Sequence, residues 1–148
     1  MNQAFMKLSV GIIAATALVA CGGESTGPGV TAAGSYTATT FMTTGPSGQN
    51  NQLLSGSTVN ITLASNGTTS GHLHLAASAS NPTVDADLTG TWSQSGMTVE
   101  FSIPAVDTFI NDMPFTLTAN GASGWDLVGD KGFDGTRIQL TLSPGGLI

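Results

Sequence analysis

The chain is poor in basic residues, in cysteine and in long apolar runs, and each shortage excludes a class of protein. Only three of its 148 residues are Lys or Arg, against nine Asp and Glu, so the net charge is −6. Nucleic-acid binding draws its affinity from clustered basic side chains, which this composition does not supply. A single cysteine excludes an internal disulfide and a thiolate metal cage. The longest apolar run, residues 8–20, is too short for a transmembrane helix of about 20 residues.

That short run has the features of a secretory signal. Lys7 precedes it, the run itself is apolar, and small residues close it. The only cysteine follows directly, in the sequence Leu-Val-Ala-Cys-Gly at 18–22. This segment resembles the lipobox of bacterial lipoproteins. The resemblance implies a signal peptide, helical before cleavage, at 1–20, and a diacylglycerol and palmitate anchor on Cys21. The alternative is a cysteine that merely falls near an ordinary cleavage site.

The lipobox resemblance also implies a location. Gly22 after the cysteine is the residue type that, in such lipoproteins, favours the outer membrane of the bacterial cell envelope. Loss of Lys7 with the signal leaves two basic residues against nine acids, a charge of −7, so the acyl chains and not electrostatics would hold the protein at a membrane. Residues 21–33 are rich in glycine and nearly free of bulky side chains, which predicts a flexible tether. We expect the folded domain at 34–143 and a loose tail at 144–148.

The domain alternates apolar and polar residues with a period of two. The pattern is clear at 58–63, 72–76, 87–93, 98–103, 115–119 and 137–142, and weaker strands are expected at 35–43, 106–110 and 125–128. Such alternation is typical of half-buried antiparallel strands. Asn66-Gly67, Ser95-Gly96, Asn120-Gly121 and Asp134-Gly135 supply turn residues between them. No ten-residue window after Ala33 shows a helical stripe, so we predict an all-β domain of eight or nine strands.

Consecutive hairpins of this kind build either a single small up-and-down antiparallel β-barrel or a two-layer β-sandwich. We favour the barrel because closure removes sheet edges, which this chain has few charged residues to protect. A barrel of this size is either filled by side chains or holds one small ligand. The inward aliphatic and aromatic positions are numerous enough to fill it, so we favour a filled core, with a ligand cavity as the alternative.

Short motifs distributed over the domain carry a second resemblance. Gly-Ser-Tyr at 34–36, Asn-Gly-Thr at 66–68, Leu-Thr-Gly-Thr-Trp-Ser at 88–93 and Val-Glu-Phe at 99–101 are similar to bacterial lipocalin-like lipoprotein domains. Lipocalins place Gly-X-Trp on the first strand and an arginine on the last strand that packs over that ring. Here Tyr36 and Arg137 hold those places, while Gly-Thr-Trp lies mid-chain. The resemblance implies a barrel whose mouth admits a small apolar ligand, with Trp92, Phe101 and Phe115 as its lining.

Two histidines form the first candidate for a metal site. His72 and His74 are two residues apart and share one strand face, and Asp87 has the same facing on the next expected strand. Imidazole and carboxylate groups could hold Zn²⁺ or Cu²⁺. That face is opposite Leu73 and Leu75, so it is the solvent-exposed outer face of the sheet. Two or three ligands on an open face do not complete a metal-coordination site. We therefore expect solvated strand residues here and no metal.

The remaining candidates are carboxylates. Asp130 and Asp134 are four apart in a glycine-rich loop, but Gly132 and Thr141 occupy positions where an EF-hand loop needs oxygen ligands, so a hairpin turn is favoured over a calcium loop. Asp107, Asp112 and Asp126 could pair as acid and base only within a deep apolar pocket. No Gly-X-Ser-X-Gly elbow accompanies the histidines. We expect neither an enzyme nor a cofactor.

These expectations combine into one hypothesis. The protein is a membrane-anchored envelope lipoprotein whose non-catalytic barrel acts in binding or scaffolding, with a small hydrophobic molecule as the ligand that the lipocalin-like resemblance implies. The alternative is a structural or adhesive β-sandwich that contacts an envelope protein or glycan.

Overall fold

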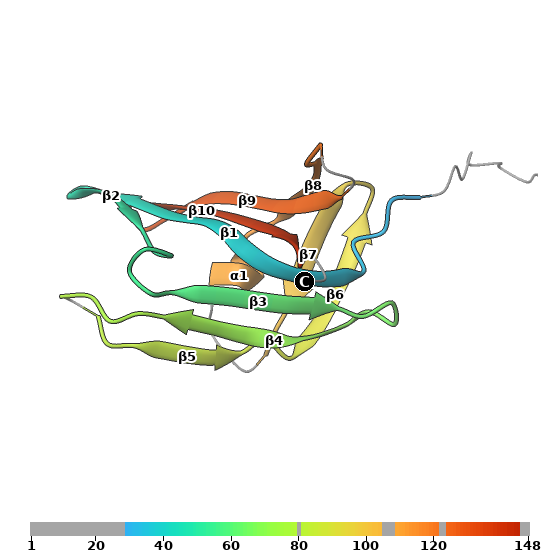
Figure 1. Ribbon diagram of the computed structural model, residues 1–148, viewed down its shortest axis with the longest axis horizontal. Helices are drawn as coiled ribbons and strands as arrows, with labels where there is room; N and C mark the ends of the chain where they lie inside the picture. Colours follow the sequence, from blue (N-terminus) through green and yellow to red (C-terminus); the bar gives the residue numbers. More distant parts are fainter. Residues whose placement is uncertain (1–28, 80, 105–108, 122–123, 146–148) are drawn as a thin grey trace, which may run out of the picture.

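The computed structural model describes residues 29–79, 81–104, 109–121 and 124–145, and these form an all-β domain (Figure 1). Its elements are β1 Gly34–Gly45, β2 Gly48–Asn51, β3 Thr58–Leu63, β4 Thr68–Leu75, β5 Val84–Asp87, β6 Gly90–Ser95, β7 Thr98–Ser102, α1 Phe109–Asp112, β8 Phe115–Ala119, β9 Trp125–Phe133 and β10 Thr136–Pro144. The ten strands belong to one sheet, and each described pairing is antiparallel.

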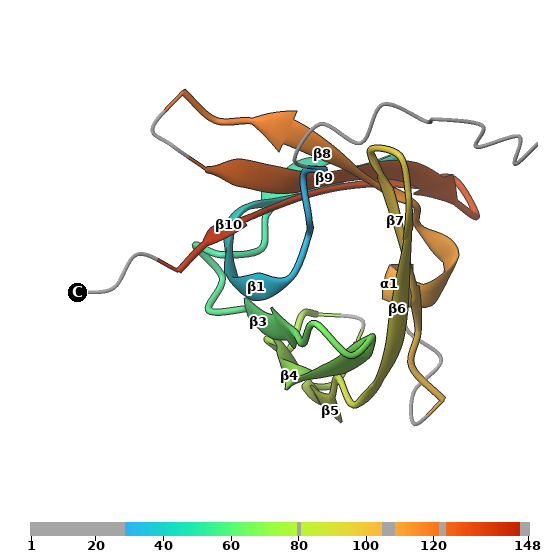
Figure 2. The same cartoon turned by 90° about the vertical axis from the view of Figure 1, so that its right-hand side faces the viewer.

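The first and last strands pair, which closes the sheet into a barrel. β1 and β10 run side by side from the Tyr36–Pro144 pair to the Thr44–Arg137 pair. The ring follows the order β1, β3, β4, β6, β7, β8, β9 and β10, and Figure 2 looks along it. The short strands β2 and β5 pair with β1 and β4 outside that ring. The predicted barrel of eight or nine strands is confirmed, with eight in the ring, and the β-sandwich alternative is wrong.

Two glycines stand where the sheet turns its corner between β4 and β6. β4 pairs with β6 only through Thr68 and Thr69, and beyond Gly71 its partner is β5. Gly71 has φ +149°, and a Cβ there would lie 2.1 Å from the carbonyl oxygen of Asn60. At Gly90 a Cβ would lie 2.2 Å from the carbonyl oxygen of Ser102. Neighbouring backbones approach so closely that only glycine fits, and this lets the sheet bend sharply into a barrel.

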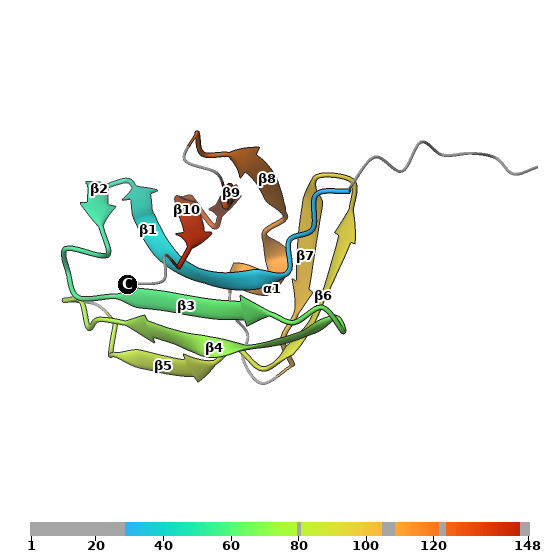
Figure 3. The same cartoon turned by 45° about the vertical axis from the view of Figure 1, so that its right-hand side comes forward.

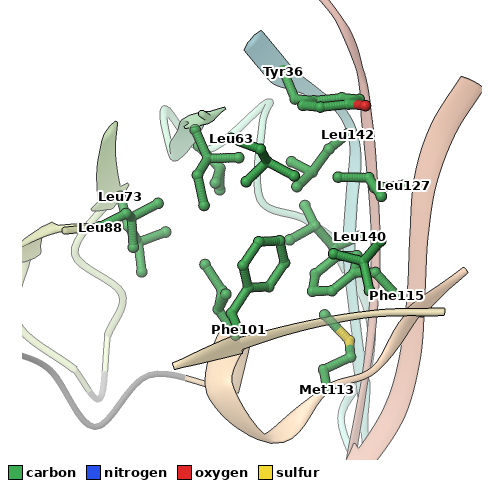
Figure 4. Packing of buried hydrophobic residues seen from close by; sticks show 14 of the residues in the cluster. Tyr36, Leu63, Leu73, Leu88, Phe101, Met113, Phe115, Leu127, Leu140 and Leu142 are labelled. Carbon is green, nitrogen blue, oxygen red and sulfur yellow. The ribbon is translucent and has the colours of Figure 1, made fainter. Parts of the chain in front are cut away.

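The period-two alternation places apolar side chains inside the barrel. Along β3, Val59, Ile61 and Leu63 are buried while the residues between them are exposed. β7, β8 and β10 repeat the pattern, and Figure 4 shows the resulting cluster with Leu73, Leu88, Leu127, Leu140 and Leu142. Each fully buried Leu, Ile or Phe side chain contributes roughly 1.5–3 kcal/mol by leaving water. The centre of the barrel is therefore packed with side chains.

Three local expectations differ from the structure. The strand expected at 106–110 is wrong at its end, because Phe109 and Ile110 lie in α1, and residues 105–108 are outside the described part. Asn111 holds this helical turn against the end of β7, since its side chain accepts from the Ile103 amide at 2.8 Å and donates to the Ile103 carbonyl at 2.9 Å. The strand expected at 87–93 is broken, because Leu88 donates its amide to the Gly71 carbonyl between β5 and β6. The third difference is β2, a strand that the sequence does not predict because its residues contain no apolar alternation.

The turn residues behave as expected. Asp134 and Gly135 have φ values of 43° and 82° and form the two-residue connection between β9 and β10. Positive φ values also occur at Gly67, Gly96 and Gly121, the second residue of each remaining predicted turn. These angles are strained for most L-residues and easy for glycine.

The segment before β1 is fixed to the barrel, alongside β6 and β7 (Figure 3). Ala32 is fully buried, its amide donates to the Gln94 side chain at 2.9 Å, and its carbonyl accepts from the Tyr36 hydroxyl at 2.9 Å. Gln94 also donates to the Val30 carbonyl at 2.8 Å. The contacts of the barrel thus begin four residues before the predicted boundary at Gly34.

The predicted signal peptide, Cys21 and the first part of the tether lie outside the described residues, as does most of the tail. Within the described ranges, no helix has the length and apolar character needed to cross a bilayer.

Candidate functional site

A pocket of about 310 Å³ lies at one end of the barrel. β2 and the β4–β5 connection mark this end, and the chain leads into β1 at the other end (Figure 1). The wall is built from β1, β4, β5, β10, α1 and the connections after β2 and β4. Its residues are Phe41, Thr43, Gln52, Leu75, Ala76, Ser78, Asn81, Pro82, Val84, Phe109 and Ile138.

The wall is mainly apolar. The rings of Phe41 and Phe109 lie 5.6 Å apart, tilted by 42°, and the side chains of Leu75 and Ile138 are half-buried beside the core. None of the lining residues carries a titratable side chain. Ligand pockets in proteins commonly have about 300–1,000 Å³ and apolar walls with a few placed polar groups. This pocket is at the small end of that range.

Four polar residues interrupt the apolar wall: Thr43 and Gln52 and, in the β4–β5 connection, Ser78 and Asn81, where the Asn81 backbone amide donates to the Ser78 hydroxyl oxygen at 3.2 Å. The Gln52 side-chain amide donates to the Thr43 hydroxyl oxygen at 2.8 Å, and both residues are half-buried. The backbone of Gln52 is also held in place, because its backbone N–H donates to the backbone carbonyl of Phe41 at 2.8 Å. The loop after β2 therefore presents Gln52 to the pocket beside Thr43.

The lining predicted from the sequence lies elsewhere. Phe101 and Phe115 pack edge to face in the core, with ring centroids 5.3 Å apart, and Phe115 has no exposed surface (Figure 4). Trp92 pairs with Phe101 across β6 and β7 and donates its indole N–H to the Ala64 carbonyl at 2.9 Å. Trp92 and Phe101 border a second hollow of about 180 Å³, which also includes Glu100. None of the three predicted residues lines the larger pocket.

Tyr36 and Arg137 do not form the ring-on-arginine contact of lipocalins. Tyr36 pairs with Pro144 at one end of the β1–β10 ladder, while Arg137 pairs with Thr44 at the other. Burial raises the pKa of the Tyr36 hydroxyl. The Arg137 guanidinium is exposed and holds Asp130, whose pKa it lowers.

The two histidines lie on the outer face of β4 in a cross-strand network with β5. His72 contacts Asp85 at 3.2 Å and Asp87 at 3.4 Å, and His74 contacts Asp85 at 2.6 Å. Asp85 was not anticipated, although it precedes Asp87 by the two residues that keep a strand face. Hydrogen bonding to Asp85 raises the pKa of His72, and hydrogen bonding to His74 lowers that of Asp85. In the described part of the chain, no three His, Cys, Asp or Glu side chains are arranged to hold a metal ion.

The other predicted carboxylates are dispersed over the surface. Asp134 forms the β9–β10 turn, and Asp126 accepts from the Asn120 side chain at 2.9 Å. Asp112 offers its backbone carbonyl to Lys131. Asp107 lies outside the described residues, and neither Asp112 nor Asp126 lines the pocket.

Comparison of the chain with protein-family models, with curated proteins and with solved structures found no match.

Sequence reasoning missed this pocket because its wall combines distant segments. Phe41 lies in a predicted strand, Phe109 in a strand that is instead a helical turn, and Gln52 in a connection with no pattern. Only a weak feature of the sequence points to this pocket. Phe41 and Phe109 are large apolar residues that lie outside the six clear alternating segments.

Proposed function

We propose that this protein is a lipid-anchored lipoprotein of the bacterial cell envelope whose lipocalin-like barrel binds a small, mainly apolar molecule without catalysing a reaction. The observation that carries the binding part is the apolar pocket at the end of the barrel. The observation that carries the anchor is the lipobox-like sequence ending in Cys21.

The composition of the pocket favours binding over catalysis. Acid–base or nucleophilic catalysis needs a titratable or activated group at the reacting atoms, and the lining residues include no such side chain. Two phenylalanine rings and half-buried aliphatic side chains offer contact area to an apolar body. Retention of a ligand is therefore the chemistry to which this wall is suited.

The position of the pocket is compatible with the anchor. The segment before β1 is fixed by Gln94 at the end of the barrel opposite the pocket. An acylated Cys21 would attach the protein to the membrane from that side. Two or more acyl chains hold a protein stably at a bilayer, so the barrel would remain attached with the pocket accessible.

The anchor is tested by metabolic labelling with palmitate in the host, with a Cys21→Ser variant as the control. We expect label in the membrane fraction for the natural chain and none for the variant. An unlabelled natural chain would remove the anchor from the proposal and leave the pocket untouched.

The ligand is tested by native mass spectrometry of the protein purified from its host. We expect a bound small molecule in the natural chain and its loss in Val84→Trp, because Val84 lines the pocket and an indole ring would occupy the space. Leu54→Trp is the matched control, since Leu54 is 87% exposed and lies outside the pocket wall. A natural chain that carries no small molecule contradicts the binding function.

A further inference from the structure

The pocket wall contains a polar pair whose hydrogen-bonding capacity is only partly used. The Gln52 amide nitrogen donates to the Thr43 hydroxyl oxygen at 2.8 Å. Among the described residues, no group accepts the Thr43 hydroxyl proton, and none donates to the side-chain carbonyl oxygen of Gln52. The pair therefore offers a ligand two donors, the Thr43 hydroxyl and the second N–H of the Gln52 side-chain amide, and one acceptor, the Gln52 side-chain carbonyl oxygen, within a mainly apolar wall. A partly buried polar group without a partner costs free energy, which a matching ligand group recovers.

The volume of the pocket limits the ligand to a compact molecule. At about 310 Å³ the pocket lies at the small end of the range of ligand pockets, which suits a compact compound of one or two rings. The tilted rings of Phe41 and Phe109 form part of the wall and suit a flat or cyclic body. A long acyl chain would extend well beyond this space.

The charge of the surroundings favours a neutral ligand. No acidic or basic side chain belongs to the wall. The two basic residues of the described chain are both engaged elsewhere, Arg137 with Asp130 and Lys131 with the Asp112 carbonyl. A carboxylate or an ammonium group in the pocket would lose hydration without gaining an opposite charge.

From these observations we propose that the pocket selects a neutral, compact apolar molecule that carries one hydroxyl or carbonyl group, which hydrogen-bonds to the Thr43–Gln52 pair. This inference rests on the proposed function and specifies its ligand class. Fatty acids and other carboxylates are excluded by it, as are hydrocarbons without a polar group.

Two matched pairs of probes test the class. 2-Naphthol and 2-methylnaphthalene have the same shape but differ in the hydroxyl group, and 2-naphthamide and 2-naphthoate differ in charge. Binding of each probe to the full chain in detergent micelles is measured by titration. The Val84→Trp variant, whose pocket is filled, gives the background from the micelles.

The decisive variant is Thr43→Val, which keeps the shape of the side chain and removes its hydroxyl. We expect Thr43→Val to lower the affinity for 2-naphthol about fivefold, which is the factor that one net hydrogen bond supplies. The affinity for 2-methylnaphthalene should change less than about twofold. Thr40→Val is the matched control, because Thr40 is exposed on the same strand and does not line the pocket. It should change neither probe. We also expect 2-naphthamide to bind at least about tenfold more tightly than 2-naphthoate.

The outcomes separate the inference from the function on which it rests. Equal effects of Thr43→Val on 2-naphthol and 2-methylnaphthalene, or tighter binding of 2-naphthoate, would overturn the selectivity while leaving a pocket that binds apolar molecules. Probe binding that is identical in the natural chain and in Val84→Trp would overturn both.

Discussion

The two corner glycines give the most direct test of how the sheet closes. In Gly90→Ala the new Cβ would lie 2.2 Å from the Ser102 carbonyl oxygen and 2.8 Å from the Ile103 Cα. Both neighbours are backbone atoms, so relief requires the strands to separate. Overpacking of this kind costs about 1–3 kcal/mol, and we expect the upper end, about 3 kcal/mol.

Gly71→Ala combines the same crowding with an unfavourable backbone conformation. Its Cβ would lie 2.1 Å from the Asn60 carbonyl oxygen, and its φ is +149°. A side chain in a sparsely populated φ region costs a further 1–3 kcal/mol or so, and we expect a total loss of about 4 kcal/mol. A domain of this size has a total stability of roughly 5–15 kcal/mol, so the variant would be close to unfolding.

Two other glycines separate the contributions. Gly96 has φ +60° and no heavy atom within 4 Å of the position that a Cβ would take, so Gly96→Ala should lose only about 1 kcal/mol from conformation. Gly132 has neither a positive φ nor a close neighbour, so Gly132→Ala should be neutral or slightly stabilising. Urea denaturation followed by tryptophan fluorescence measures each free energy of unfolding. The reasoning is refuted if Gly71→Ala and Gly90→Ala lose no more stability than Gly96→Ala.

The histidine network and the segment before β1 give two further predictions. Asp85→Asn should lower the pKa of His72 measured by NMR titration, because hydrogen bonding to Asp85 is the main cause that raises it, and an unchanged pKa would contradict the network. Since the folded-state pKa of His72 is raised, its stabilising contribution is complete below the ordinary value of 6.5 and disappears as pH rises through the raised pKa. Gln94→Ala should speed hydrogen exchange of the Ala32 amide at least tenfold, because that amide loses its acceptor. Gln49→Ala, at an exposed position, is the control and should leave this exchange rate unchanged. Equal protection of the Ala32 amide in both variants would show that Gln94 does not hold the segment.

The sheet was predictable from the sequence because strand facing is a local property. Along β3, for example, the side chains of Val59, Ile61 and Leu63 face the interior of the barrel, and the side chain of Thr62 faces solvent. Turn residues such as Asp134 then fix where the chain reverses. Closure of the barrel followed from the need to avoid open edges, and the β1–β10 pairing satisfies it.

The pocket was not predictable in the same way, because alternation gives the facing of a side chain but not its height along the barrel. Phe115 and Phe41 both face inward, yet Phe115 lies in the packed centre and Phe41 borders the pocket. The difference depends on which distant segments cover each level. Gln52 and Phe109 reach the pocket through a connection and a helical turn that carry no period-two pattern.

The two ends of the barrel have different structures, and this bears on where a ligand would come from. Along β1, Tyr36 contacts the fixed segment at one end and Thr43 borders the pocket at the other, about 23 Å away for seven residues of extended strand. With the proposed anchor on the side of Tyr36, the packed core lies between the pocket and the anchored end of the chain. In an orientation that keeps this anchored end toward the bilayer, a ligand arrives through water and not from the acyl region of that membrane. A neutral molecule with one polar group meets this condition because it is soluble enough to diffuse and apolar enough to be retained.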